Sequence, residues 1–108
     1  MNAARNTLIR ARALIEQGWC QHRSRCSIEG NVQHCMLGAL DSVAHGLTER
    51  EGAKSALLSV IPAQALYPFG SITAWNDAFG RTKSEVLDKY DEAINSLREE
   101  PLEPITRA

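Results

Sequence analysis

The sequence predicts an all-α, mainly helical fold: a small bundle of about five helices, with an ordered loop or short hairpin between the first two. Three observations predict it. Apolar residues recur at intervals of three and four along most of the chain, which is the spacing of an amphipathic helix. Glycines follow several of these segments, where helices commonly end. Two Thr-x-x-Glu sequences have the pattern of a capping box, which begins a helix.

The first helix is predicted over residues 3–17, because Leu8, Ala11 and Ile15 share one face and Gly18 follows. Residues 19–31 have neither helical nor strand periodicity and carry two cysteines, a histidine and a glycine. We therefore expect this segment to form the ordered loop or short hairpin.

Residues 32–44 present a broad apolar surface and are followed by Gly46, which predicts the central helix of the bundle. The capping box that begins at Thr48 predicts a third helix that ends near Ile61, before Pro62. Residues 62–70 are rich in turn-forming and aromatic residues and form the expected connection to the next helix.

A short fourth helix, capped by Ser71, is expected to carry Ile72, Trp75 and Phe79. The second capping box, at Thr82, predicts the last helix. Its apolar stripe has the clearest register in the chain and comprises Val86, Tyr90, Ala93, Ile94 and Leu97.

Length and composition set the class of protein. The chain has 108 residues, so we expect one helical domain over residues 1–98 and a flexible C-terminal tail over residues 99–108, which contains two prolines. Hydrophobic residues make up 44% and charged residues 23%, as in ordinary globular proteins. The net charge of −1 lacks the surplus of Lys and Arg that neutralises phosphates, so nucleic acid is not the expected partner.

The expected compartment is the cytoplasm. No stretch approaches the roughly 20 apolar residues that cross a bilayer, and the N-terminus lacks the apolar run of a signal peptide. We therefore expect no membrane association. The three cysteines form an odd number, which fits reduced thiols or a metal site better than a disulfide framework.

Three short motifs carry a resemblance. They are Gly18-Trp19-Cys20-Gln21 (GWCQ), Cys35-Met36-Leu37-Gly38-Ala39-Leu40 (CxxGAL), and Trp75-Asn76-Asp77 (WND) ahead of Arg81-Thr82 and Glu85-Val86-Leu87. With them the chain resembles an uncharacterised family of short bacterial and phage proteins, whose segment between the first two motifs is longer. The resemblance spans most of the chain and implies a shared helical fold and a bacterial or phage origin, but no activity.

Cys20, His22 and Cys26 are the candidate metal ligands, with His34 and Cys35 nearby in sequence. Thiolate and imidazole groups are the donors that tetrahedral zinc favours. The spacing lacks the paired C-x-x-C sequences of common zinc modules, however, and a free cysteine on an apolar face behaves as a small hydrophobe. We therefore expect no cofactor and keep zinc as the alternative.

Cys35 is the candidate nucleophile of a thiol enzyme. A position near a helix start can lower the pKa of a thiol, with His22 as the base and Asp77 as the group that orients it. The competing interpretation is a buried structural cysteine, which we favour.

Trp19, Gln21, Trp75, Asn76 and Asp77 are the candidate residues for binding a ligand or a partner. The competing interpretation makes Trp75 a core residue and uses Asn76 and Asp77 for hydrogen bonds within the fold. Trp19 has the same two interpretations.

Positive charge is concentrated in the first quarter of the chain, and the rest is weighted toward acidic residues. Because this asymmetry can mark a binding face and no convincing catalytic set is present, we expect a small non-enzymatic protein that binds another protein. Its role would be accessory or host-modulating. The alternative is a small thiol-dependent enzyme or ligand-binding protein that uses Cys35 with Asn76 and Asp77.

Overall fold

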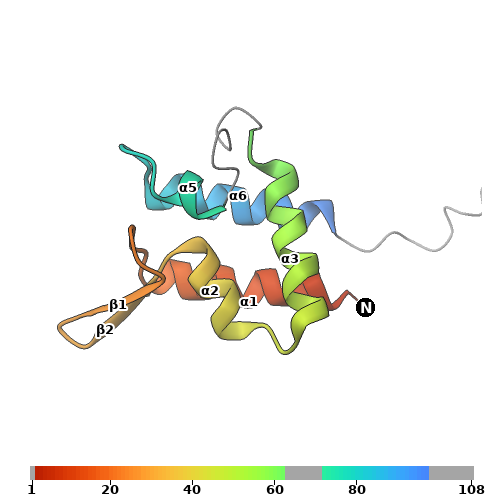
Figure 1. Cartoon of the computed structure of the whole chain (residues 1–108), viewed down its shortest axis with the longest axis horizontal. Coiled ribbons are helices and arrows are strands. Elements are labelled where there is room, and N and C mark those ends of the chain that lie inside the picture. The colour runs from red at the N-terminus through yellow and green to blue at the C-terminus, as the bar shows by residue number, and fades with distance from the viewer. Residues whose placement is uncertain (1, 63–71, 98–108) are drawn as a thin grey trace, which may run out of the picture.

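A computed structural model describes residues 2–62 and 72–97, which form five helices and one β-hairpin (Figure 1). The elements in chain order are α1 (Ala3–Gln17), β1 (Arg25–Ile28), β2 (Asn31–His34), α2 (Met36–Val43), α3 (Leu47–Val60), α5 (Ile72–Asn76) and α6 (Lys83–Ser96). The mainly helical fold is confirmed, and a short hairpin lies between the first two helices, so the description as an all-α bundle fits only roughly. Most of the connection predicted over residues 62–70, the cap at Ser71 and the C-terminal tail lie outside the described residues.

Helix α1 begins and ends where the sequence predicts. The side-chain oxygen of Asn2 accepts the backbone N–H of Arg5, which satisfies one of the free donors of the first turn. Leu8, Ala11 and Ile15 are fully buried along one face. This face forms one wall of the core.

Helices α1 and α6 contact each other, α3 packs against both, and α2 packs on α1 (Figure 1). Tyr90 of α6 is fully buried, and its hydroxyl group donates to the carbonyl oxygen of Met36 at 2.6 Å. This hydrogen bond ties the last helix to the start of α2. The buried cluster also contains Leu40, Leu57, Ile72, Trp75, Val86 and Ile94.

The central helix is shorter than the prediction over residues 32–44. Residues Asn31–His34 form β2, which pairs antiparallel with β1, and α2 starts only at Met36. A two-residue turn joins the strands, and its Glu29 and Gly30 both have positive φ angles, as tight hairpin turns require. The apolar run at 32–44 therefore combines a strand with a helix, two elements that periodicity alone does not separate.

The capping box predicted at Thr48 is wrong. Helix α3 begins at Leu47, so its N-cap residue is Gly46 and not Thr48, and no side chain of the cap residue binds the first turn. Glu49 instead accepts the backbone N–H of His45 at 3.1 Å and hydrogen-bonds Thr7 of α1. A contact between distant segments thus overrides the local pattern.

The second capping box, Thr82 with Glu85, is confirmed at the start of α6. Helix α5 is also confirmed, but it ends at Asn76, and Phe79 lies in the following turn with its side chain fully exposed. The prediction that α5 carries Phe79 is therefore wrong. None of the described helices is both long enough and apolar enough to span a membrane.

Gly38 allows the backbone of Ser24 to lie directly against α2. A Cβ atom at this position would overlap the carbonyl oxygen of Ser24 and lie 2.8 Å from its carbonyl carbon. We expect Gly38→Ala to lower the free energy of unfolding by about 3 kcal/mol, because backbone on both sides resists displacement. Urea unfolding monitored by tryptophan fluorescence measures this loss.

The matched control is Gly46→Ala, since a Cβ atom there meets nothing within 4 Å. The control should change the stability by less than about 1 kcal/mol. Equal losses in the two variants would contradict the close approach of Ser24 to α2.

Candidate functional site

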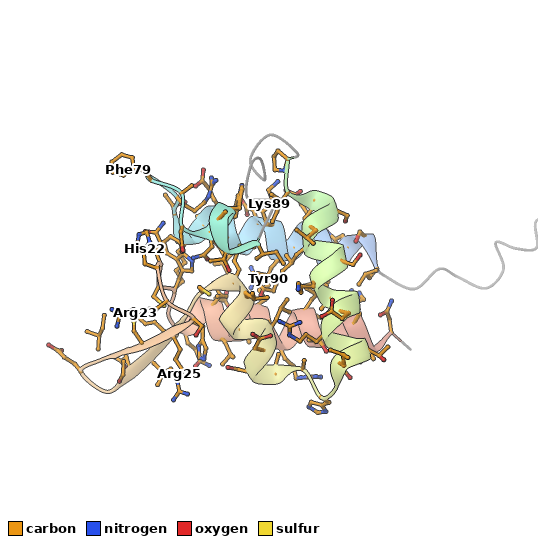
Figure 2. The ribbon with its side chains drawn as sticks, viewed as in Figure 1. His22, Arg23, Arg25, Phe79, Lys89 and Tyr90 are labelled. Atoms are coloured by element: carbon orange, nitrogen blue, oxygen red, sulfur yellow. The ribbon has the colours of Figure 1, made fainter. Side chains whose placement is uncertain are left out.

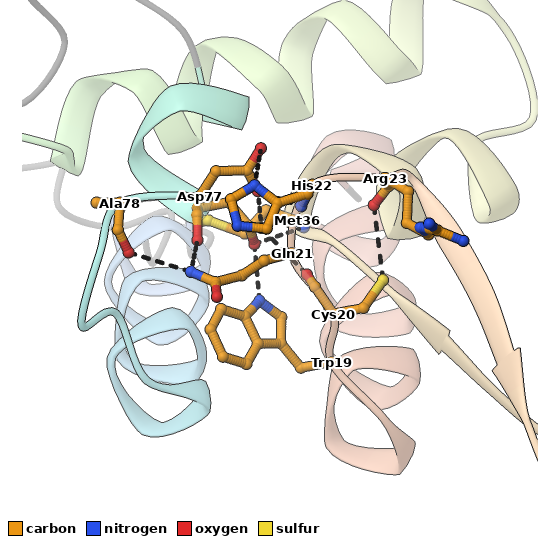
Figure 3. Close-up of polar contacts among 9 residues, drawn as sticks. Trp19, Cys20, Gln21, His22, Arg23, Met36, Asp77 and Ala78 are labelled. Atoms are coloured by element: carbon orange, nitrogen blue, oxygen red, sulfur yellow. Dashed lines mark hydrogen bonds and ion pairs between the residues drawn. The ribbon is translucent and has the colours of Figure 1, made fainter.

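The buried amide of Asn76 connects three segments at one end of the molecule. Its oxygen accepts the indole N–H of Trp19 at 2.7 Å and the backbone N–H of Met36 at 3.1 Å. Its NH2 group donates to the carbonyl oxygen of Cys20 at 3.1 Å and to the carboxylate of Asp77 at 2.9 Å. The side chain is fully buried. Figure 3 shows the residues that it binds, among them Trp19, Cys20 and Asp77. One amide thus holds together the end of α5, the start of α2 and the loop after α1.

Gln21 and Asp77 make further hydrogen bonds that fix the loop after α1. The amide group of Gln21 donates to the carbonyl oxygens of Asn76 and Ala78, at 3.0 and 3.1 Å. Asp77 accepts the backbone N–H of His22 at 2.8 Å, and His22 has a φ of 70° (Figure 3). A positive φ is unfavourable for a residue with a side chain, so these hydrogen bonds hold the loop in a strained conformation.

A cavity of about 210 Å³ lies between this loop, α2 and α5. It brings together the three candidate catalytic residues, His22, Cys35 and Asp77. Its other lining residues are Arg23, Ser24, Leu37, Gly38, Asp41 and Thr73. Asn76 is not among them, because its side chain is enclosed by the hydrogen bonds described above.

Cys35 is the N-cap of α2. Its Sγ atom accepts the backbone N–H of Gly38 at 3.3 Å, and only 3% of the residue is exposed. Burial raises the pKa of the thiol, and the negative charge of Asp77 raises it further, although hydrogen bonds from the start of α2 act in the opposite direction. The thiol therefore stays protonated near neutral pH, which does not suit a nucleophile.

His22 does not form a catalytic pair with Cys35. Among the described residues, the imidazole has one charged neighbour within ion-pair distance, Asp77, at 3.9 Å between Nδ1 and Oδ2. The side chain of His22 is 72% exposed, and no hydrogen bond connects it to the thiol. The geometry thus places the three groups around one cavity without linking them for proton transfer.

The candidate zinc ligands contact other groups. The thiol of Cys20 lies 3.6 Å from the carbonyl oxygen of Arg23, and that of Cys26 lies 3.4 Å from the amide oxygen of Gln33. Burial, followed by the neighbouring Cys26, raises the pKa of Cys20 to about 12. Across residues 2–62 and 72–97, no three His, Cys, Asp or Glu side chains are grouped to hold a metal ion.

The two tryptophans have structural contacts. Trp75 is buried in the core, and the guanidinium group of Arg81 lies 3.7 Å from the centre of its ring. Trp19 is half-buried, and its indole N–H is bound by Asn76. Both side chains therefore support the fold at the same end as the cavity.

The same end of the molecule carries exposed apolar side chains that the sequence analysis did not propose for binding. Phe79 projects from the turn after α5, and Ile28 is 53% exposed in the hairpin. Figure 2 shows Phe79, His22, Arg23 and Arg25 along the same end of the molecule. We refer to the part formed by residues 20–34 and 77–80 as the loop–hairpin end. The signal available for Phe79 was Gly80, which has a positive φ and marks a turn there.

Comparison with known proteins identifies a family but no activity. The sequence profile of a family described as "Family of unknown function (DUF6197)" matches residues 1–96. Neither the curated proteins nor the solved structures contain a significant match to this chain.

The role of Asn76 can be tested with Asn76→Asp, which keeps the size and one acceptor but replaces the NH2 donor by a buried negative charge. We expect a loss of about 3 kcal/mol or more in the free energy of unfolding at pH 7, because Cys20 loses its donor and Asp77 gains a charged neighbour. Chemical denaturation measures it. Asn95→Asp, at an exposed position of α6, should be nearly neutral, and a similar loss there would argue against the hub.

The burial and the raised pKa of Cys35 predict that its thiol reacts slowly. With an aromatic disulfide reagent at pH 8, the half-buried Cys26 should react at least tenfold faster than Cys35, because only the thiolate of an accessible cysteine attacks. Mass spectrometry of peptides from timed samples assigns the rates. Rapid modification of Cys35 in the folded protein would instead support the thiol-enzyme interpretation. Unfolding in urea should make all three cysteines react at similar rates.

Proposed function

The chain belongs to the DUF6197 family of unknown function, and we propose that it is a small non-enzymatic protein that works by binding another protein through its loop–hairpin end. The observation that carries the proposal is the fully exposed Phe79 on a turn anchored by hydrogen bonds to Ala78 and Asp77. Burying a phenylalanine side chain contributes about 2–3 kcal/mol. An anchored backbone also loses little conformational freedom on binding.

The polar residues in and beside the loop–hairpin end support the same proposal. Asn76 and Gln21 are engaged in hydrogen bonds that hold the backbone, and the Cys35 thiol caps a helix with a raised pKa. These residues are therefore suited to shaping a surface rather than to transferring protons. For a protein of bacterial or phage origin, such binding fits an accessory or host-modulating role. We place this role in the cytoplasm, where thiols stay reduced.

The cavity favours a second candidate, the binding of a small polar ligand. Cys35, Asp77 and Thr73 line a space of about 210 Å³, which suits a ligand of a few heavy atoms. A small-molecule screen by thermal shift tests this candidate. A compound that raises the melting temperature of the wild type but not of Thr73→Trp, which fills the cavity, would support it.

Partner binding can be tested by photo-crosslinking in the cell that encodes the protein. A photoreactive phenylalanine derivative replaces Phe79 in one variant and Leu47 in another. Leu47 is also exposed but lies at the start of α3. We expect a single crosslinked protein of defined mass from position 79, and none from position 47.

Untagged wild-type protein added in excess should lower the yield of the crosslink. The untagged Phe79→Ser variant, added in the same amount, should not. Crosslinks of equal yield from both positions, or competition by Phe79→Ser as strong as by the wild type, would refute binding through this end.

A further inference from the structure

One edge of the hairpin pairs with another segment, and the other edge has no backbone partner among the described residues. On the outer side of β2, the N–H of His34 donates to Gly18, and the carbonyl oxygen of His34 accepts from Cys20, both at 3.1 Å. Residues 18–20 thus already add to this side of the sheet, with a parallel bridge between Trp19 and His34. No described residue forms a backbone hydrogen bond with the outer side of β1.

The register shows which groups face outward from β1. Ile28 pairs with Asn31 next to the two-residue turn, so this pair exchanges hydrogen bonds and the pattern then alternates along the ladder. The bond from the Cys35 N–H to the Ser24 carbonyl oxygen, two pairs beyond Cys26, agrees with this alternation. The backbone N–H and C=O groups of Arg25 and Ser27 therefore point away from β2, available to another strand.

The charge along this edge is not neutralised. Among the described residues, the guanidinium groups of Arg23 and Arg25 form no hydrogen bond and no ion pair. The other described arginines donate to a carboxylate or to a backbone carbonyl group. Within residues 2–62 and 72–97, the unpaired arginines are thus Arg23 and Arg25, and Figure 2 shows both projecting from this end.

We propose that an extended, acidic segment of a partner protein adds to the free edge of β1 as a strand, with its carboxylates near Arg23 and Arg25. The segment's backbone would bond to Arg25 and Ser27, as in other cases of strand addition. The inference rests on the proposed function and names the chemistry of the partner.

The positive charge of Arg23 and Arg25 also disfavours the pairing of β1 with other kinds of strand. An unprotected edge strand can pair with another copy of itself, and charged residues oppose this. A second β1 would place its own Arg25 beside this one, which like-charge repulsion disfavours. A basic segment is disfavoured for the same reason, whereas an acidic one supplies the missing counter-charges. The exposed Ile28 offers the same segment an apolar contact.

A display library of random 12-residue peptides, selected on the immobilised full chain, tests the inference. We expect enriched peptides in which Asp or Glu alternates with apolar residues. The best peptide, labelled with fluorescein, should bind at least fivefold more weakly to Arg25→Glu than to wild type, in fluorescence polarisation at 50 mM salt. Lys54→Glu makes the same charge change on α3 and should alter binding less than twofold.

Strand addition is distinguished from simple charge attraction by Ser27→Pro, which removes an outward N–H without removing a hairpin hydrogen bond. We expect at least a fivefold loss of affinity, with Ser27→Thr binding as the wild type does. Amide chemical shifts of the wild type, titrated with the peptide, should change most at Arg25 and Ser27, so the readout does not depend on the folding of the proline variant. Undisturbed shifts at these residues would overturn the proposal.

Enrichment of basic or uncharged peptides, or of none, would also overturn it. The proposal would also be overturned by a single-stranded oligonucleotide that displaces the peptide, binds more tightly than the peptide does, and loses affinity in Arg25→Glu to the same extent. These outcomes leave the crosslink at Phe79 unaffected. A partner that still crosslinks there after Ser27→Pro and Arg25→Glu would preserve the proposed function while rejecting this edge as its binding site.

Discussion

The side chain of Asn76 is the constraint on which the loop–hairpin end depends. An amide has two donor hydrogens and an acceptor oxygen, and here they bind groups from two segments, residues 19–20 and Met36, that are far from Asn76 in sequence. A buried amide without partners would be strongly destabilising, so these segments must assemble together. The indole of Trp19 contributes both a donor and an apolar surface, and it therefore fixes the loop after α1 relative to α5.

The strained and crowded features of this end follow from that assembly. Asp77 follows Asn76 directly, so its carboxylate is placed to bind the backbone N–H of His22 in a conformation with positive φ. The loop then runs back over α2 so closely that position 38 has no room for a Cβ atom. The hairpin extends from this base, so the short two-stranded ribbon does not stand alone but continues from segments held by Asn76 and Asp77 (Figure 1).

Elements whose stability is mostly local could be predicted from the sequence. Helices α1 and α6 combine a complete apolar stripe with a cap or a turn residue, and the box at Thr82 operates within four residues. The errors occur where a distant contact decides. The box at Thr48 would use Glu51, but the carboxylate of Glu51 binds Arg50, and Glu49 near the start of α3 is bound by Thr7 and Arg10 from another helix. Likewise, Val32 continues an apolar helical pattern, yet the pairing of its neighbours Asn31 and Gln33 with β1 places it in a strand.

For the candidate site, the residue types were predictable but their roles were not. Trp19, Gln21, Asn76 and Asp77 do lie together, linked by hydrogen bonds to one another and to nearby backbone groups. Because these hydrogen bonds use the polar groups within the protein itself, little capacity remains for a ligand. The groups that retain capacity are surface groups without partners, and sequence patterns do not reveal which charges are paired. Arg23 and Arg25 differ from Arg12, which binds Asp91, only in what the fold brings near them. A binding surface of this kind is therefore recognised by which charged side chains have partners within the fold. Among the described residues, the arginines without partners lie in the hairpin and the loop before it, and not in the three short sequence motifs.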